Sequence, residues 1–228
     1  MSYVTPMPQP SVLSMLHGRA SLRPHDVAFT FTNYDGDWEG VREDVTWSQL
    51  SRRTSNVARE LSFHGSVGDR AVILAPQSLD YIAAFLGSMQ AGLIAVPLPL
   101  PHRGSRHERV GAVLADAAPA VVLTASAVAQ DVAEYVDAAH LDTVPKIVEV
   151  DSMHLDVDSE TSFRATDLPS TAYLQYSSGS TRQPTGVMIS HANLQTNFEQ
   201  LMRSYFAGTT VPSDITMVSW LPFYHDMG

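Results

Sequence analysis

Residues 70–75 read RAVILA, and three more short apolar runs follow along the chain. These runs are residues 93–96 (LIAV), 120–124 (AVVLT) and 146–150 (KIVEV). Helical periodicity separates them at residues 78–90, 106–117 and 127–139. Strands without polar alternation, joined by helices, are typical of a parallel sheet covered on both faces. The sequence therefore predicts an α/β fold with a mostly parallel, layered sheet and helices on both faces.

A β-hairpin is predicted before this region. Residues 27–33 (VAFTFTN) and 41–47 are its strands, and Asp35-Gly36-Asp37 provides the turn. Thr46 and Gln49 fit a capping box. The box begins a helix that Gly65 ends and whose apolar face consists of Leu50, Val57, Ala58 and Leu61. Residues 1–10 are predicted to form a loose arm.

The last third of the chain has a different pattern. Residues 151–169 are acidic and without a clear period, so we expect a connection between two parts of the fold. We predict a strand at residues 171–176, a long helix at 191–206 and another strand at 215–220. A parallel sheet rarely ends on a strand without a covering helix, so the chain resembles a truncated one.

The composition excludes several classes of protein. Of the 228 residues, 44% are hydrophobic and 17% charged, as in a globular protein with a core. The net charge of −10 has the wrong sign for a general nucleic-acid binder. Without cysteine the chain has no disulfide and no thiolate metal site. The longest apolar stretch, residues 93–101, is too short to cross a bilayer, and the pattern of a signal peptide is missing. We therefore expect a cytoplasmic protein with no transmembrane segment.

Residues 177–186 (SSGSTRQPTG) carry the strongest chemical signal. Small residues let backbone N–H groups approach an anion, and Arg182 adds a charge that can bridge phosphate oxygens. The hydroxyl residues and glycines are Ser177, Ser178, Gly179, Ser180, Thr181, Thr185 and Gly186. The stretch matches neither the Walker A pattern nor GxGxxG. We interpret it as a phosphate-binding loop; the alternative is an ordinary polar surface loop.

Residues 220–228 (WLPFYHDMG) carry a second signal. They place His225 between Tyr224 and Asp226 on a loop at the carboxyl end of a predicted strand, where open α/β sheets bind ligands. His225 is a candidate for catalysis, for a substrate contact or for a gate, and the alternative is a structural histidine. A basic cluster is either a solvated helix start or a site for an adenosine tail or acidic partner; it comprises His102, Arg103, Arg106, His107 and Arg109. HExxH and G-x-S-x-G are both missing.

Together, the two segments resemble a known superfamily. Residues 176–194 (YSSGSTRQPTGVMISHANL) are similar to the phosphate-loop signature of the adenylate-forming enzymes, and residues 220–228 are similar to their next motif. Arg182, Pro184 and the His-Asp-Met-Gly run resemble one branch, the fatty acyl-AMP ligases. Thr185 stands where most relatives have lysine. Residues 24–31, 45–50, 56–74 and 86–98 follow the order of segments seen in that family, so the resemblance covers nearly the whole chain.

The resemblance implies a reaction and roles for residues. A fatty-acid carboxylate would attack the α-phosphate of ATP, giving acyl-adenylate and pyrophosphate. The phosphate loop, residues 177–182 together with Gly186, would hold ATP, and His225 would lie near the carboxylate beside Tyr224 and Asp226. Mg²⁺ would bridge phosphates through ligands mostly outside this chain. The acyl group would pass to an acyl-carrier or polyketide-synthase protein.

The organisation expected from these observations has four parts. They are residues 1–26 (arm and first helix), 27–150 (hairpin and α/β subdomain), 151–169 (acidic connection) and 170–228 (phosphate-loop strand, helix and a truncated second α/β part). We expect these residues alone to be inactive and to self-associate through apolar surface. The alternatives are a fatty acyl-CoA ligase, a non-catalytic dimerisation or carrier-binding module, and an unrelated phosphate-binding protein.

Overall fold

The computed structural model describes residues 11–101, 107–158, 163–165, 167–176, 184–210, 212 and 214–225; of residues 107–109 it describes the backbone alone. The strands are β1 (Val27–Asn33), β2 (Val41–Thr46), β3 (Arg70–Ile73), β4 (Ile94–Pro97), β5 (Val121–Thr124), β6 (Lys146–Glu149), β7 (Thr171–Tyr176) and β8 (Gly186–Ser190). The helices are α1 (Val12–Leu22), α2 (Trp47–Leu61), α3 (Leu79–Gln90), α4 (His107–Ala117), α5 (Ala129–Ala138) and α6 (His191–Tyr205), with short 3₁₀ turns η1 (Ser126–Val128) and η2 (Val150–Ser152).

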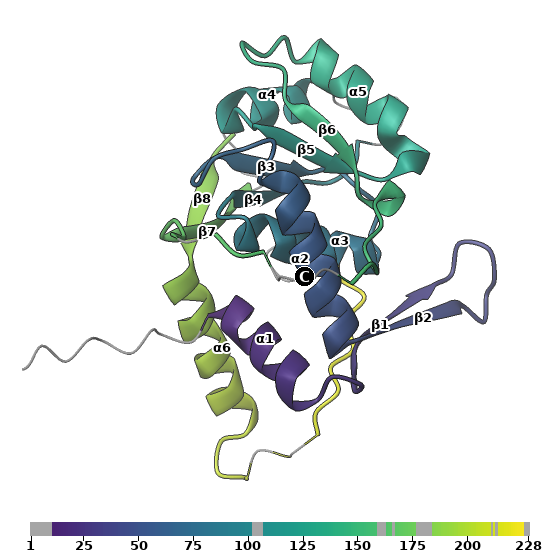
Figure 1. The fold of residues 1–228 in the computed structure, drawn as a ribbon, viewed down its shortest axis with the longest axis vertical. Coiled ribbons are helices and arrows are strands. Elements are labelled where there is room, and N and C mark those ends of the chain that lie inside the picture. The colour runs from purple at the N-terminus through teal and green to yellow at the C-terminus, as the bar shows by residue number, and fades with distance from the viewer. Residues whose placement is uncertain are drawn as a thin grey trace, which may run out of the picture.

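A six-stranded sheet with the order β6-β5-β3-β4-β7-β8 forms the centre of the fold (Figure 1). β3 to β7 pair in parallel, because each is joined to the next through a helix or a long connection. Side chains of α2 and α3 pack on one face of the sheet, and those of α4 and α5 pack on the other. The predicted α/β fold with helices on both faces is confirmed.

The hairpin and the capping signals are also confirmed. β1 and β2 pair antiparallel and project away from the body of the molecule (Figure 1). The Thr46 side chain accepts a hydrogen bond from the Gln49 backbone and the Gln49 side chain accepts one from Thr46, so α2 begins with the predicted capping box. Ser78 caps α3 in a similar way. α2 ends at Leu61, four residues before Gly65.

β7 and β8 close one side of the sheet as a hairpin. β7 pairs parallel to β4 through Ala95 and Tyr173, whereas β8 pairs antiparallel to β7. Residues 186–190 were not predicted to form a strand. α6 follows β8 directly and begins with a capping box between Ser190 and Asn193.

The strand predicted at residues 215–220 is wrong. Residues 214–220 form no strand, and Met217, Val218 and Trp220 are 74%, 84% and 87% exposed. Their β-branched and aromatic composition favours an extended chain, but a strand needs a partner for its backbone hydrogen bonds. The edges of the described sheet are β6 and β8, and residues 214–220 pair with neither of them.

The acidic connection is fixed to α2 and α3. We call residues 153–158 and 163–165 the strap. The Asn56 amide donates to the carbonyls of Leu155 and Val157 over 2.8 and 2.9 Å. Ser55 accepts a 2.8 Å hydrogen bond from the Phe163 backbone.

Ion pairs and a backbone contact add to these hydrogen bonds. Arg52 and Arg53 on α2 pair with Asp158 and Asp156. The Ala165 backbone donates to the Gln90 carbonyl at the end of α3.

Candidate functional site

The carboxyl ends of the parallel strands share one edge of the sheet, and the phosphate loop leaves from that edge. β7 ends at Tyr176, and β8 resumes at Gly186. Open α/β sheets bind ligands along such an edge. Ser177, Ser178, Gly179, Ser180, Thr181 and Arg182 lie outside the described residues. The two ends of the loop are described, and they fix where it starts and returns.

Tyr176 and Gly186 form the base of the loop. The two residues are register partners, and a Cβ on Gly186 would come within 2.9 Å of the Tyr176 ring. Gly186 therefore leaves the space that the ring occupies, a packing reason for this glycine. Tyr176 Oη donates a 2.6 Å hydrogen bond to Oδ2 of Asp116 on α4. Burial and this hydrogen bond together raise the pKa of Tyr176.

The second motif crosses the same edge. We call residues 221–225 the histidine segment. The Gln77 Nε2 donates to the Leu221 carbonyl over 3.0 Å, and Gln175 Nε2 donates to the Tyr224 carbonyl over 2.9 Å. The His225 backbone N–H donates to the Pro222 carbonyl, so the segment turns at its end. Gln175 lies two residues before the phosphate loop, so the structure brings the β7 end of that loop next to the histidine segment.

Aromatic packing adds to the hydrogen bonds that hold the histidine segment on the molecule. The rings of Phe223 and Tyr81 lie 5.5 Å apart between centroids. Tyr81 is 3% exposed, and its hydroxyl has no hydrogen-bond partner among the described residues. Burial, with the nearby Tyr224 phenol, raises the pKa of Tyr81, which stays protonated at neutral pH.

A cleft of about 560 Å³ lies beside Gln77 and Tyr81, which contact the histidine segment. Its floor is formed by the chain after β3 and β5, and one wall is formed by the hairpin β1–β2. The lining includes Phe31, Val41, Gln77, Ser78, Tyr81 and Thr124. β3 leads to α3 on one face of the sheet and β5 leads to α5 on the other, so the cleft lies at a topological switch point.

Arg53 organises the charges at one side of the cleft. Its Nε and Nη2 atoms contact the two carboxylate oxygens of Asp156 at 2.9 and 2.8 Å, and Nη1 lies 3.3 Å from Asp80 and 3.8 Å from Glu43. The hydrogen bond from Arg53 lowers the pKa of Asp156, and its charge adds to the effect. Burial raises the pKa of Asp80 although Arg53 opposes it.

Of the predicted site residues outside 177–182, three lie at the edge formed by the carboxyl ends of the strands. The structure does not describe the side chains of the others. His225 is exposed, Tyr224 is half-buried and Gly186 begins β8. Asp226 lies outside the described residues, and so do His102, Arg103 and Arg106; the side chains of His107 and Arg109 are not described.

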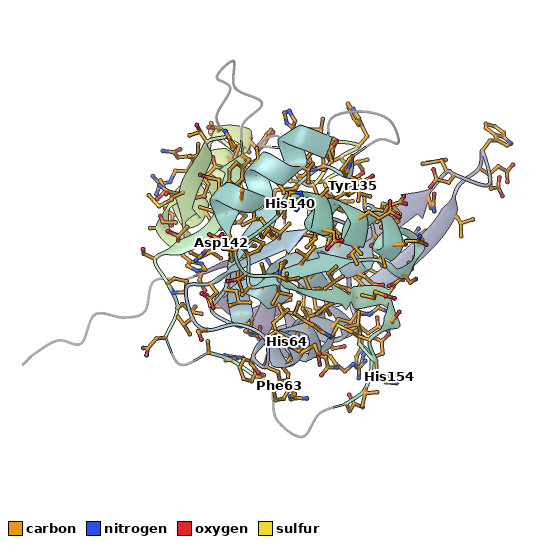
Figure 2. All side chains as sticks on the ribbon, turned by 90° about the horizontal axis from the view of Figure 1, so that it is seen from above. Phe63, His64, Tyr135, His140, Asp142 and His154 are labelled. Atoms are coloured by element: carbon orange, nitrogen blue, oxygen red, sulfur yellow. The ribbon has the colours of Figure 1, made fainter. Side chains whose placement is uncertain are left out.

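The described side chains include no group of three His, Asp or Glu residues that could hold a metal ion. Figure 2 shows His64, His140 and His154 well apart on the surface. In the part of the chain that the structure describes, no helix is long and apolar enough to cross a membrane.

Sequence reasoning missed the residues that hold the site together. Gln77 and Gln175 donate to the histidine segment, and Asp116 accepts from Tyr176. A signal exists for the glutamines, since each is a polar residue at the carboxyl end of an apolar strand. Asp116 gives no such signal, because its partner is sixty residues away in the sequence.

The chain matches known proteins over nearly its whole length. A family model described as AMP-binding enzyme matches residues 16–228. A Mycobacterium leprae protein named as the fatty-acid–CoA ligase fadD21 is 64% identical over 97% of this chain and 39% of its own length. The long-chain-fatty-acid–AMP ligase FadD28 of Mycobacterium tuberculosis is 53% identical over 96% of this chain and 38% of its own length. The chain thus spans about two fifths of the length of these curated relatives.

Solved structures match the fold as well. A fatty acyl-adenylate ligase from Legionella pneumophila, in complex with acyl adenylate and pyrophosphate, aligns with a TM-score of 0.78 and 30% identity. The alignment covers 96% of this chain and 36% of that chain. The nonribosomal peptide synthetase FmoA3, bound to α-methyl-L-serine-AMP, aligns with a TM-score of 0.66 and 21% identity, covering 89% of this chain and 20% of that one. This second likeness concerns the fold alone.

Proposed function

The chain belongs to the AMP-binding enzyme family, and from this premise we propose that it is part of a fatty acyl-AMP ligase. In the proposed reaction a fatty-acid carboxylate oxygen attacks the α-phosphorus of ATP. The bond between the α-phosphorus and the oxygen that bridges to the β-phosphate breaks, and pyrophosphate leaves. Such a reaction depends on orientation and on neutralising the triphosphate charge, without a covalent protein nucleophile.

The observation that carries this proposal is the contact between the histidine segment and the end of β7, from which the phosphate loop leaves. Gln175 on β7, two residues before the phosphate loop, donates to the Tyr224 carbonyl next to His225. A group bound by the loop and a group beside His225 would therefore be neighbours. The Legionella pneumophila relative, described with acyl adenylate and pyrophosphate, supports the same chemistry.

Each predicted residue receives a role in the proposal. The backbone and hydroxyls of Ser177, Ser178, Gly179, Ser180 and Thr181 bind the β- and γ-phosphates, and Arg182 neutralises part of their charge. His225 lies near the carboxylate, with Tyr224 and Asp226 beside it. Gly186 admits the Tyr176 ring and so fixes where the loop returns.

We propose Mg²⁺ as the metal of this reaction; when bound, it would neutralise part of the charge of the phosphates. The described residues do not form a complete site for it, because none of their acidic and histidine side chains make a group of three that could hold a metal ion. We therefore assign its ligands elsewhere and derive no step through it.

The proposal includes the acceptor and the behaviour of the chain by itself. Acyl transfer goes to an acyl-carrier or polyketide-synthase protein in the cytoplasm, where ATP is available. Because the chain spans 39% of the length of its relative, we propose that these 228 residues alone do not turn over. Exposed apolar residues on β8, α6 and the 214–220 stretch favour self-association of the isolated chain.

The test uses a chimera in which residues 1–228 replace the matching stretch of the Mycobacterium leprae relative. We expect ATP–pyrophosphate exchange that depends on lauric acid. Arg182→Ala should lower kcat/KM for ATP roughly 10- to 100-fold, the effect of losing a hydrogen bond to a charged group worth about 1.5–3 kcal/mol. Arg203→Ala is the matched control, because Arg203 is an exposed arginine on α6. Unchanged exchange in Arg182→Ala would reject the role of the loop.

A fatty acyl-CoA ligase is the second candidate, and one observation favours it. The relative at 64% identity is named as a CoA ligase, whereas the AMP ligase is 53% identical. Both candidates share the adenylation step and differ in the acceptor. The chimera should be offered coenzyme A and, separately, a carrier protein with its phosphopantetheine arm. Acylation of the carrier alone supports the AMP ligase, and efficient formation of acyl-CoA supports the alternative.

A further inference from the structure

We propose that Gln175 is a positioning residue that holds the His225 end of the histidine segment against β7. The inference rests on the proposed function, since it concerns how two reactants are held in that reaction. Gln175 is the penultimate residue of β7, and its side-chain amide donates a 2.9 Å hydrogen bond to the carbonyl of Tyr224. One side chain thus joins the element that carries one motif to the backbone of the other.

The direction of Gln175 follows from the alternation of β7. Leu174 and Tyr176 pack into the cluster that contains α4 and α5. Tyr173 packs on the opposite face, where its ring lies 5.5 Å from that of Phe85 on α3. Because alternate residues share a face, Gln175 points to the α3 side, where the histidine segment crosses. The Gln175 amide donates to the Tyr224 carbonyl there, and an apolar side chain of the same length would leave that carbonyl without this donor.

The histidine segment has a second and a third attachment, both to the region around α3. Gln77 holds the Leu221 carbonyl, and the Tyr81 ring packs on Phe223. These two contacts hold the segment on the molecule. Gln175 is different, because it comes from β7 and not from the region around α3. Losing it should leave the segment bound at Leu221 and Phe223 and let its His225 end shift relative to β7.

Such a shift acts on the reaction and only weakly on binding. The reacting carboxylate and phosphate must lie about 3–3.5 Å apart, and a misplacement of about 1 Å can cost roughly 100-fold in rate. ATP would still be bound by the loop, and the alkyl chain of the fatty acid would still be buried. The expected signature is therefore a fall in kcat with nearly constant KM for both substrates.

The experiment compares Gln175→Met with Asn56→Leu in the chimera described above. Gln175→Met keeps the length of the side chain and removes its N–H donors. Asn56 is the matched control, because its amide also holds backbone carbonyls, those of the strap. We expect Gln175→Met to lower kcat at least about tenfold, with KM for ATP and lauric acid changed less than about threefold. Asn56→Leu should change kcat less than about twofold at a similar loss of Tm.

Equal changes of kcat in the two variants, or an effect of Gln175→Met on KM in place of kcat, would overturn the proposal. Hydrogen exchange provides a readout that does not need activity. Gln175→Met should speed exchange in peptides covering residues 221–225, and Asn56→Leu should not. Unchanged exchange there also overturns the inference. An unmodified chimera without any acyl-adenylate would count against the proposed function, whereas the exchange result would still decide the role of Gln175.

Discussion

The two halves of the six-stranded sheet, taken along its strand order, are packed very differently. In the half that contains β3 and β5, residues 71–74 and 121–123 are fully buried beneath helices on both faces. In the other half, β8 is an edge strand whose Met188 is 71% exposed, and α6 has no buried residue. The contact between Gln175 and the histidine segment lies at the boundary, because β7 pairs with β4 on one side and with the exposed β8 on the other. The fold thus supports the site from one side and leaves the other side open.

This contrast predicts how stability is distributed. Burial of apolar area stabilises the β3–β6 part with its helices, whereas β8, α6 and residues 214–220 expose apolar side chains. A segment with little buried area opens at low free energy, independently of global unfolding.

The largest expected effect comes from a cavity in the buried part. Leu114 on α4 is fully buried, and Leu114→Ala should lower the free energy of unfolding by about 2–5 kcal/mol. Leu201 on α6 is 44% exposed, so Leu201→Ala should change it by less than about 0.5 kcal/mol. Urea denaturation of both variants checks the comparison. Similar losses in the two variants would mean that α6 is part of the same cooperative unit.

A smaller effect should come from the boundary. Gly186→Val adds a side chain where a Cβ alone would meet the Tyr176 ring at 2.9 Å. The ring must move away from Asp116, so we expect a loss of about 1–3 kcal/mol of unfolding free energy and a weaker Tyr176–Asp116 hydrogen bond. Gly36→Val, at an open turn position, is the control. Equal Tm values for the two variants would contradict the packing role of Gly186.

The smallest effect concerns pH and tests whether the strap belongs to the stable part. The pKa of Asp156 is held below its usual 3.8 by Arg53, so its contribution to stability is complete above that pH and is lost as the pH falls below it. The raised pKa of Asp80 acts in the opposite direction, because its penalty appears as the pH rises. Asp156→Asn should therefore flatten the fall in unfolding free energy between pH 5 and pH 3, by about 1 kcal/mol or less. Parallel acid-unfolding curves for the variant and the unmodified chain would contradict this.

The sequence predicted the elements whose signals are local. The Asp35-Gly36-Asp37 turn and the Thr46–Gln49 capping box depend on a few neighbouring residues, and the structure contains both the hairpin and the helix start. Residues 186–190 and 215–220 show the opposite case. Both are short and β-prone, and whether they form strands depends on a partner: β8 finds β7, whereas residues 214–220 find none in the described sheet.

The same distinction applies to the site. The two motifs could be located because their residue types carry the chemistry, and their closeness follows from the sheet edge that β7 shares with β3. The contacts that fix their geometry are long-range: Gln77 reaches Leu221 across 144 residues, and Gln175 reaches Tyr224 across 49. No local pattern encodes such pairs. Arg182→Ala tests the proposed role of the phosphate loop, and Gln175→Met tests the proposed positioning of His225.

The strap has a consequence for the order of events on the ribosome. Arg53 precedes its partner Asp156 by 103 residues in the sequence, and Ser55 precedes Phe163 by 108 residues. At a translation rate of about 5–20 residues per second, α2 exists for roughly 5–20 s before its partners are synthesised. During that interval Arg53 can pair with Glu43 and Asp80 but not with Asp156, and Ser55 lacks its partner on the strap. The strap thus forms its contacts with α2 late, after the first two thirds of the chain have been synthesised.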